Sequence, residues 1–236
     1  RLQRFKAIKP KPVALAQRTL VSGRPLVDGR AMPWLYTPAV DDVDLAGWVL
    51  EQRSRLRREL LQSGALLFRG FALKTVQDFE SVAQAFCGEL FGDYGDLPRE
   101  KSGRHVYGST PYPPDKPILF HNESSHMHRW PQKQFFFCLQ AAQEGGQTPI
   151  VDGRLMFKGL RPDLRERLRE KQLMYVRNFV PGVDVSWQDF FRTSDKAEVE
   201  ALCAKNGMDW QWLEKGGLRT KQVCPAIIEH PDTGES

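Results

Sequence analysis

Three histidines and one glutamate lie within eight positions of one another, directly after an apolar run at residues 118–120. Imidazole and carboxylate groups are ligands for Fe(II), Mn(II) and Zn(II), and they also serve as general acids and bases. A His-x-acid pair alone is a weak motif, because such pairs more often form ion pairs on the surface. A metal site, an acid–base cluster and ordinary polar residues are therefore all open. The four residues are His121, Glu123, His126 and His128.

The spacing of His121 and Glu123 suits a shared metal ion if residues 118–124 form a β-strand. Side chains alternate between the two faces of a strand, so residues two apart point to the same side. His126 and His128 lie an odd number of positions from His121, and we interpret them as loop or substrate-pocket residues rather than ligands. Two histidines and one carboxylate on one side of an octahedral ion leave three positions open, as a non-haem Fe(II) oxygenase requires.

The elements around this segment are predicted from hydrophobic periodicity and from helix-capping residues. Thr75 is expected to cap a helix, with Asp78 three residues further on, and Gly64 is expected to end a helix. Short apolar runs bounded by glycine or polar residues are expected to be strands. The predicted helices are 44–64, 75–91, 155–172 and 195–207, and the predicted strands are 65–71, 118–124, 134–142 and 173–179, with a turn at 145–153 that leads into a further strand.

This order of elements predicts an α+β chain, in which a sheet or barrel-like core carries helices on one side. The 236 residues are enough for a domain with its own hydrophobic core, and we expect a single domain, 1–236. Residues 92–117 are crowded with glycine, proline and serine. Because a loop of this length in a compact domain is usually functional or mobile, we expect it to have a role at the site.

The composition narrows the function classes. The formal charge of +5 is spread over helix-like stretches that mix arginine and glutamate, which is typical of solvated helix faces rather than of nucleic-acid-binding surfaces. The four cysteines include no C-x-x-C pair, so we expect buried free thiols instead of disulfides or a zinc ribbon. No apolar run is long enough to cross a bilayer, and the basic start lacks the apolar core of a signal peptide. We expect a cytoplasmic protein that binds neither nucleic acid nor membrane.

Four motifs follow one another along the chain: GALLFRGF at 64–71, HNE at 121–123, GGQT at 145–148 and HPDTG at 230–234. Together they extend over essentially the whole chain and resemble the taurine dioxygenase-like (TauD/TfdA) family of Fe(II)- and 2-oxoglutarate-dependent oxygenases. The stretches VDVSWQDFF and GLRTKQ are most similar to the SyrP-like branch, which is associated with hydroxylating amino acids in specialised metabolism. The combination is much more specific than HNE alone.

The resemblance implies a double-stranded β-helix (jelly-roll) core with flanking helices, Fe(II) as the metal, 2-oxoglutarate as cosubstrate and O₂ as oxidant. His121 and Glu123 would be the first two iron ligands, and Thr148 would hydrogen-bond a 2-oxoglutarate carboxylate. Glutamate stands here in place of the commoner aspartate, and the retained carboxylate argues against a halogenase. The expected reaction hydroxylates an unactivated C–H bond of an amino acid, free or bound to a carrier protein, with residues 92–117 as a lid.

The resemblance also implies a distal histidine as third iron ligand and an arginine for the other 2-oxoglutarate carboxylate, both well beyond HPDTG. The sequence ends at Ser236, so we expect the natural protein to continue and to supply both residues. Two other functions stay open. One is a zinc-dependent hydrolase that uses His121, Glu123 and either His126 or His128, and the other is a degenerate oxygenase-like module that binds a partner.

The remaining polar and aromatic residues receive structural interpretations. His105 is expected to be exposed in the long loop, and His230 to be a structural residue of a turn. Arg154 and Arg177 are at least as compatible with surface ion pairs as with steering an anionic substrate. The aromatic residues expected in the core are Trp187, Trp210 and Trp212, and residues 135–137 are expected in a buried strand.

Overall fold

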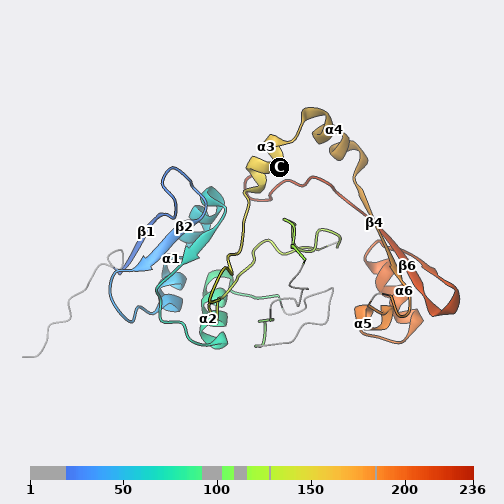
Figure 1. Cartoon of the computed structure of the whole chain (residues 1–236), viewed down its shortest axis with the longest axis horizontal. Helices are drawn as coiled ribbons and strands as arrows, with labels where there is room; N and C mark the ends of the chain where they lie inside the picture. Colours follow the sequence, from blue (N-terminus) through green and yellow to red (C-terminus); the bar gives the residue numbers. More distant parts are fainter. Residues whose placement is uncertain (1–19, 92–102, 109–115, 128, 184) are drawn as a thin grey trace, which may run out of the picture. The chain divides into compact units, whose positions relative to one another are not determined.

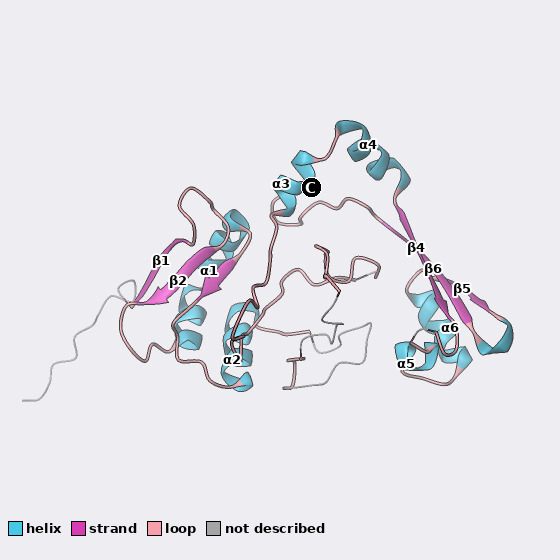
Figure 2. Ribbon diagram, viewed as in Figure 1, coloured by secondary structure: helices cyan, strands magenta, loops and turns pink. Residues whose placement is uncertain are grey.

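The computed structural model describes residues 20–91, 103–108, 116–127, 129–183 and 185–236. The chain divides into two compact units, residues 1–74 and residues 75–236 (Figure 1). Helices and short strands occur in both units (Figure 2), which confirms the predicted α+β class. Of the helices in the described segments, none is long and apolar enough to cross a membrane.

The first unit is a three-stranded sheet with one long helix between its second and third strands. Strands β1 and β2 are antiparallel, whereas β2 and β3 are parallel. A parallel pair needs a crossover connection, and helix α1 provides it. The elements are β1 (Val21–Pro25), β2 (Trp34–Pro38), α1 (Leu45–Ser63) and β3 (Leu66–Phe68).

Helix α1 begins and ends as its capping residues predict. The Asp44 side chain accepts a hydrogen bond from the Gly47 backbone N–H at 3.0 Å, which satisfies one of the free donors of the first turn. Gly64 has a φ of 77° and donates its N–H to the Leu60 carbonyl. The predicted helix and its glycine stop are therefore confirmed.

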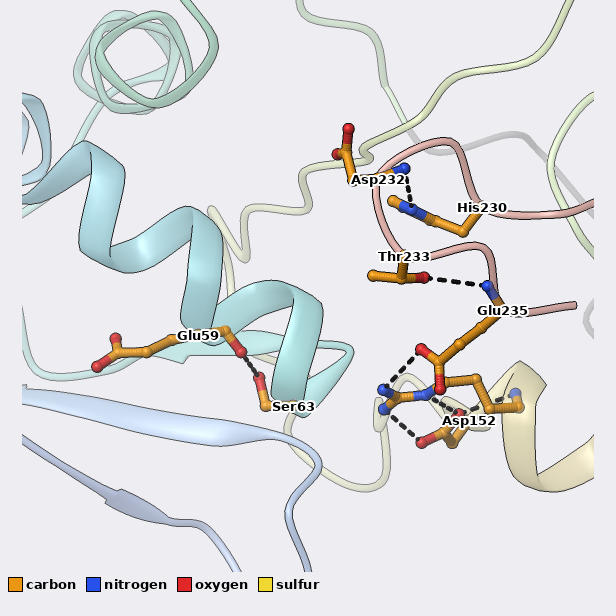
Figure 3. A network of polar contacts seen from close by, with 8 residues as sticks. Glu59, Ser63, Asp152, His230, Asp232, Thr233 and Glu235 are labelled. Atoms are coloured by element: carbon orange, nitrogen blue, oxygen red, sulfur yellow. Dashed lines mark hydrogen bonds and ion pairs between the residues drawn. The ribbon is translucent and has the colours of Figure 1, made fainter.

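A polar network lies between α1 and the first sheet. The fully buried Tyr36 donates its hydroxyl hydrogen to Glu59, and Arg55 donates to the same carboxylate at 2.8 Å. Burial and the Glu59 carboxylate raise the pKa of Tyr36. Ser63 Oγ donates to the Glu59 backbone carbonyl at 2.8 Å (Figure 3). Buried polar groups need such partners, so the network fixes how the helix packs on β2.

Helix α2 (Val76–Cys87) opens the second unit with a capping box. Thr75 Oγ1 accepts a hydrogen bond from the Asp78 N–H at 3.1 Å, and the Asp78 carboxylate accepts one from the Thr75 N–H at 2.9 Å. The predicted N-cap is confirmed. The helix stops at Cys87, before the predicted end at residue 91, because Gly88 takes a φ of 86°.

The helix predicted at 155–172 is two helices, α3 (Gly153–Gly159) and α4 (Pro162–Lys171). Pro162 lies in the first turn of α4, where its missing N–H costs nothing. Proline also disfavours helical geometry in the residue before it, so the two helices cannot run on as one. Pro162 is visible in the sequence, so the prediction of one continuous helix was wrong at a position where the break could be expected.

The second sheet and two further helices enclose a small core. All its strand pairs are antiparallel, in the order β4-β6-β5. The core side chains come from both strands and helices and are Phe179, Trp187, Val199, Cys203 and Leu218. The strand predicted at 173–179 and the helix predicted at 195–207 are confirmed. The elements are β4 (Leu173–Phe179), α5 (Trp187–Phe191), α6 (Lys196–Lys205), β5 (Asp209–Trp212) and β6 (Leu218–Cys224).

The strands predicted at 118–124, at 134–142 and after residue 145 are wrong for this structure. No strand occurs between residues 116 and 152 in the part of the chain that the structure describes. A strand needs a hydrogen-bonded neighbour, and the described strands pair only within the two three-stranded sheets. The described residues therefore do not display the jelly-roll core.

The aromatic run at 135–137 keeps the side-chain alternation of a strand without its hydrogen bonds. The Phe137 ring stacks on Phe79 of α2 at 5.2 Å, and the Phe135 ring meets Phe86 of the same helix edge-on at 5.8 Å, whereas Phe136 is 74% exposed. Residues two apart thus share a side. The expectation that residues 135–137 lie in a buried strand is therefore wrong.

Candidate metal and cosubstrate site

His121 and Glu123 lie at the entrance to a tight turn and face each other. The His121 Nε2 atom is 3.9 Å from a Glu123 carboxylate oxygen, and the two side chains are 60% and 23% exposed. Ser124 has a φ of 56°, and the Met127 N–H donates to the Ser124 carbonyl at 2.9 Å. The pair is therefore brought together by a local turn and not by strand pairing.

A backbone carbonyl fixes the orientation of the His121 ring. The ring Nδ1 lies 2.8 Å from the Leu119 carbonyl oxygen. A carbonyl only accepts, so Nδ1 carries the hydrogen, and in the neutral ring the Nε2 lone pair is free to bind a metal. Metal-binding histidines commonly donate their other ring N–H in this way. The side of the ring with the free lone pair is the one that faces Glu123.

The two donor atoms are close enough to reach one transition-metal ion. Bonds from zinc to nitrogen and oxygen ligands are about 2.1 Å long, so atoms 3.9 Å apart can both reach the same ion. Neighbouring ligands of an octahedral ion are about 3 Å apart at these bond lengths, so the two side chains would close by about 1 Å on binding it. An imidazole and a carboxylate suit Fe(II), Mn(II) and Zn(II). Within the described segments, no third His, Cys, Asp or Glu side chain joins the pair in a cluster that could hold a metal ion.

Of the other two histidines in the segment after residue 120, His126 contacts the second sheet. The His126 ring lies 5.9 Å from the Tyr175 ring of β4, at 58° to it. This places it against the second sheet, in keeping with a loop or pocket residue. His128 lies outside the described residues.

The turn that carries Glu123 rests on one end of the second sheet. The Tyr175 hydroxyl donates to Ser125 Oγ at 3.4 Å, and Cys224 Sγ lies 3.9 Å from the Met127 carbonyl oxygen. Sequence reasoning missed this support. Its only signal was the alternation in β4, which puts Tyr175 on the same side as the core residue Phe179.

Thr148 follows two glycines that form a turn separate from the one at Glu123. Gly145 and Gly146 have φ values of 69° and 74°, a conformation that glycine adopts without strain. A Cβ atom on Gly146 would lie 2.7 Å from the Cβ of Ala142, so glycine is also required there by space. The Thr148 side chain is exposed and precedes the start of α3.

Helix α3 begins at an ionic network that reaches the HPDTG turn. Asp152 caps the helix by accepting from the Arg154 N–H at 2.9 Å, and the Arg154 guanidinium binds Asp152 at 2.8 Å and Glu235 at 3.6 Å. The hydrogen bonds from Arg154 hold the pKa of Asp152 below its usual range. Arg154 therefore links Asp152, four residues after the GGQT motif, to Glu235, the residue that follows the HPDTG motif.

His230 is a structural residue of its turn, as predicted. Its carbonyl accepts from the Gly234 N–H at 2.8 Å, and its ring Nδ1 accepts from the Asp232 N–H at 3.2 Å. The Thr233 hydroxyl accepts from the Glu235 N–H at 3.3 Å (Figure 3). These hydrogen bonds stabilise the turn, and they give His230, Thr233 and Gly234 of the motif a structural role.

His105 is paired, so the prediction of a simply exposed loop residue is wrong. Its ring Nδ1 lies 2.7 Å from Glu80 of α2, and its side chain is 26% exposed. Burial alone would raise the pKa of Glu80, but hydrogen bonds from the His105 ring and from the backbone N–H groups of His105 and Arg104 hold it below its usual range. Most of the predicted lid at 92–117 lies outside the described residues.

The remaining interpretations are partly confirmed. Trp187 is buried in the core and Trp212 packs against it, whereas Trp210 is 38% exposed. Arg177 lies over the rings of Phe179 and Phe190 at 4.9 Å and 4.6 Å. The thiols of Cys203 and Cys224 are buried as predicted, but Cys138 is exposed and Cys87 only partly buried.

Most of the chain is matched by one family of known proteins. The sequence profile of the Taurine catabolism dioxygenase TauD, TfdA family matches residues 28–236. The chain belongs to this family. Members of the TauD, TfdA family depend on Fe(II) and 2-oxoglutarate, so these are the metal and cosubstrate that membership implies. The match spans both compact units.

Two curated proteins are similar over most of the chain. The dapdiamide synthesis protein DdaC of Enterobacter agglomerans is 36% identical over 209 residues, which are 88% of this chain and 63% of DdaC. A clavaminate synthase-like protein of Arabidopsis thaliana is 35% identical over 187 residues, which are 75% of this chain and 57% of that protein. The chain thus spans about three-fifths of the length of these relatives.

Proposed function

We propose that this protein is an Fe(II)- and 2-oxoglutarate-dependent oxygenase that hydroxylates an unactivated C–H bond. The observation that carries the proposal is the 3.9 Å separation of His121 Nε2 and a Glu123 carboxylate oxygen, with the opposite ring nitrogen held by the Leu119 carbonyl. Membership of the TauD, TfdA family supplies the matching cofactor chemistry.

The roles of the chain's residues follow from their donor atoms. When bound, iron and 2-oxoglutarate supply, with O₂, the oxidising power for hydroxylation, and 2-oxoglutarate leaves as succinate and CO₂. His121 binds the metal through Nε2 and Glu123 through its carboxylate. The Thr148 hydroxyl donates a hydrogen bond to a carboxylate oxygen of 2-oxoglutarate, and the turn at Gly145 and Gly146 holds it in place.

The third metal ligand lies outside the described residues in this proposal. The chain spans about three-fifths of the length of its relatives, and the described residues hold no cluster of three ligands.

An amino acid, free or carried on a carrier protein, is the substrate class we propose. The support is the similarity to a protein named for dapdiamide synthesis, together with the sequence stretches that resemble the SyrP-like branch. O₂ is the other reactant, and no further partner is needed for the reaction.

The degenerate, non-catalytic module is the second candidate, and the absence of a three-ligand cluster among the described residues favours it. The zinc hydrolase has less support, because the His126 ring lies against Tyr175. The three functions separate in one experiment, in which anaerobic protein is loaded with Fe(II), 2-oxoglutarate and O₂ are added, and succinate is measured.

An oxygenase forms succinate, and the variants His121→Ala and Glu123→Ala do not. Glu170→Ala, at an exposed position of α4, serves as the matched control and keeps the wild-type rate. If the protein neither takes up iron nor forms succinate, the binding module is favoured. Hydrolytic activity with zinc that ignores 2-oxoglutarate would favour the hydrolase.

A further inference from the structure

We propose that Tyr175 is a positioning residue for the metal-binding pair, because it holds the turn after Glu123 against the second sheet. This inference rests on the proposed function, since it assigns a role toward the metal that His121 and Glu123 would bind. It concerns a residue outside all four sequence motifs.

The turn is closed by the hydrogen bond from the Met127 N–H to the Ser124 carbonyl. It belongs to no strand, and Ser124 takes a left-handed φ of 56°, which a residue with a Cβ adopts only against a steric cost. His121 at its start is 60% exposed. Conformational entropy therefore opposes the arrangement in which His121 and Glu123 face each other, unless contacts from elsewhere offset it.

Tyr175 makes two of those contacts. Its hydroxyl donates to Ser125 Oγ at 3.4 Å, and its ring lies 5.9 Å from the His126 ring. These are the second and third residues after Glu123. The phenol thus contacts the turn by both a polar and an apolar part, as partly buried tyrosines do.

The strand register explains why Tyr175 is in the right place. In the antiparallel pair, Tyr175 is opposite Gln222 and Leu173 is opposite Cys224. Residues two apart on a strand share a face, so Tyr175 and Cys224 are diagonal neighbours on one side of the sheet. The Cys224 thiol lies 3.9 Å from the Met127 carbonyl oxygen, which adds a contact at the far end of the same turn.

The strand that carries Tyr175 is anchored in the second sheet. Strand β4 pairs with β6 along its whole length, and its last residue, Phe179, is 1% exposed in the core. Tyr175 therefore links an exposed turn to a strand that is hydrogen-bonded along its length. Outer residues that orient metal ligands typically contribute about 10- to 100-fold to metal affinity.

The positioning role of Tyr175 is tested by a titration with Mn(II) in the presence of 2-oxoglutarate, monitored by proton NMR. The chain has five histidines, so their ring signals are few, and paramagnetic broadening identifies the ring nearest the metal even when binding is weak. In the wild type the His121 signal broadens first. Tyr175→Ala raises the Mn(II) dissociation constant by about tenfold, and Tyr175→Phe, which keeps the ring beside His126, restores most of the affinity.

Val176→Ala is the matched control, because Val176 is the next residue, points to the other side of β4 and is 49% exposed. It leaves the dissociation constant unchanged. Equal affinity in wild type and in Tyr175→Ala, with both folded by circular dichroism, would overturn the positioning role alone. Wild-type broadening that Glu123→Ala does not reduce would overturn the proposed metal pair, and with it this inference. If Tyr175→Ala does not fold, Ser125→Ala replaces it, with a smaller increase in the dissociation constant expected and no change overturning the role.

Discussion

The Nε2 atom of His121 lies 3.9 Å from a carboxylate oxygen of Glu123, although neither residue belongs to a β-strand. The side of the imidazole opposite to Glu123 is engaged by the Leu119 carbonyl. An exposed histidine that is oriented by its own backbone and faces a carboxylate is arranged as a metal ligand is. The predictions below follow from this pair and from the turns around it.

Removing the Glu123 carboxylate should abolish metal-dependent turnover, whereas shortening it should not. Glu123→Ala is expected to lower the rate of succinate formation by more than about 100-fold, since a direct ligand contributes more than the outer residues that orient it. Glu123→Asp keeps the oxygen ligand and is expected to stay active with weaker Fe(II) binding. Fe(II)-dependent succinate assays measure both. If Glu123→Ala and Glu123→Asp lost the same fraction of the rate of succinate formation, the carboxylate would not act as a ligand.

Gly146→Ala should damage the turn that carries Thr148. The new Cβ would meet the Ala142 Cβ at 2.7 Å, at a φ of 74°, so a destabilisation of about 1–2 kcal/mol and a higher KM for 2-oxoglutarate are expected. Gly159→Ala is the control, because nothing lies within 4 Å of its Cβ position in α3. It should be neutral or stabilising by up to about 1 kcal/mol. An unchanged KM in Gly146→Ala would argue against the role of the turn in cosubstrate binding.

The ion pair at the start of α3 should make stability depend on acidic pH. Arg154 holds the pKa of Asp152 below its usual range, so the carboxylate stabilises the fold above the unfolded-state pKa of about 3.9 and loses this effect as pH falls through the folded-state value. Asp152→Asn keeps an N-cap oxygen but removes the charge. At pH 7 it is expected to cost about 1 kcal/mol of unfolding free energy in urea, and at pH 3 much less. An equal cost at both pH values would contradict the ionic explanation.

The Glu80 carboxylate should hold residues 103–108 against α2. It accepts from the His105 ring at 2.7 Å and from the His105 backbone N–H at 2.9 Å. Glu80→Ala is expected to speed backbone hydrogen exchange of residues 103–108 by about 30-fold, because two hydrogen bonds of about 1 kcal/mol each are lost. Glu89→Ala, close by beyond the end of the same helix, is the control. Unchanged exchange in Glu80→Ala would show that the segment is held by other contacts.

The elements that sequence predicted correctly are those determined by neighbouring residues. The capping box at Thr75 and the glycine stop at Gly64 are local, and both helices form where expected. The prediction failed at residues 118–124, because strand formation depends on a partner far along the chain. Pro162 shows a different failure, since the local signal was present in the sequence and one helix was predicted across it.

The proximity of His121 and Glu123 was predicted from the sequence, but the reason for it was wrong. His121 and Glu123 were expected to face one way because a strand would alternate their side chains, and a turn achieves their proximity instead. Tyr175 and Cys224 could not have been predicted as supports of that turn. Their contacts arise from the register of β4 and β6, which is set by pairing between residues about fifty positions apart, as in Tyr175 and Gln222 (222 − 175 = 47).

The most direct test of the central claim is the anomalous scattering of Mn(II) in crystals of the protein soaked with 2-oxoglutarate. An anomalous peak within about 2.2 Å of both His121 Nε2 and a Glu123 carboxylate oxygen is the predicted result. A peak bound by other residues, or His121 and Glu123 side chains turned apart with no peak between them, would contradict it.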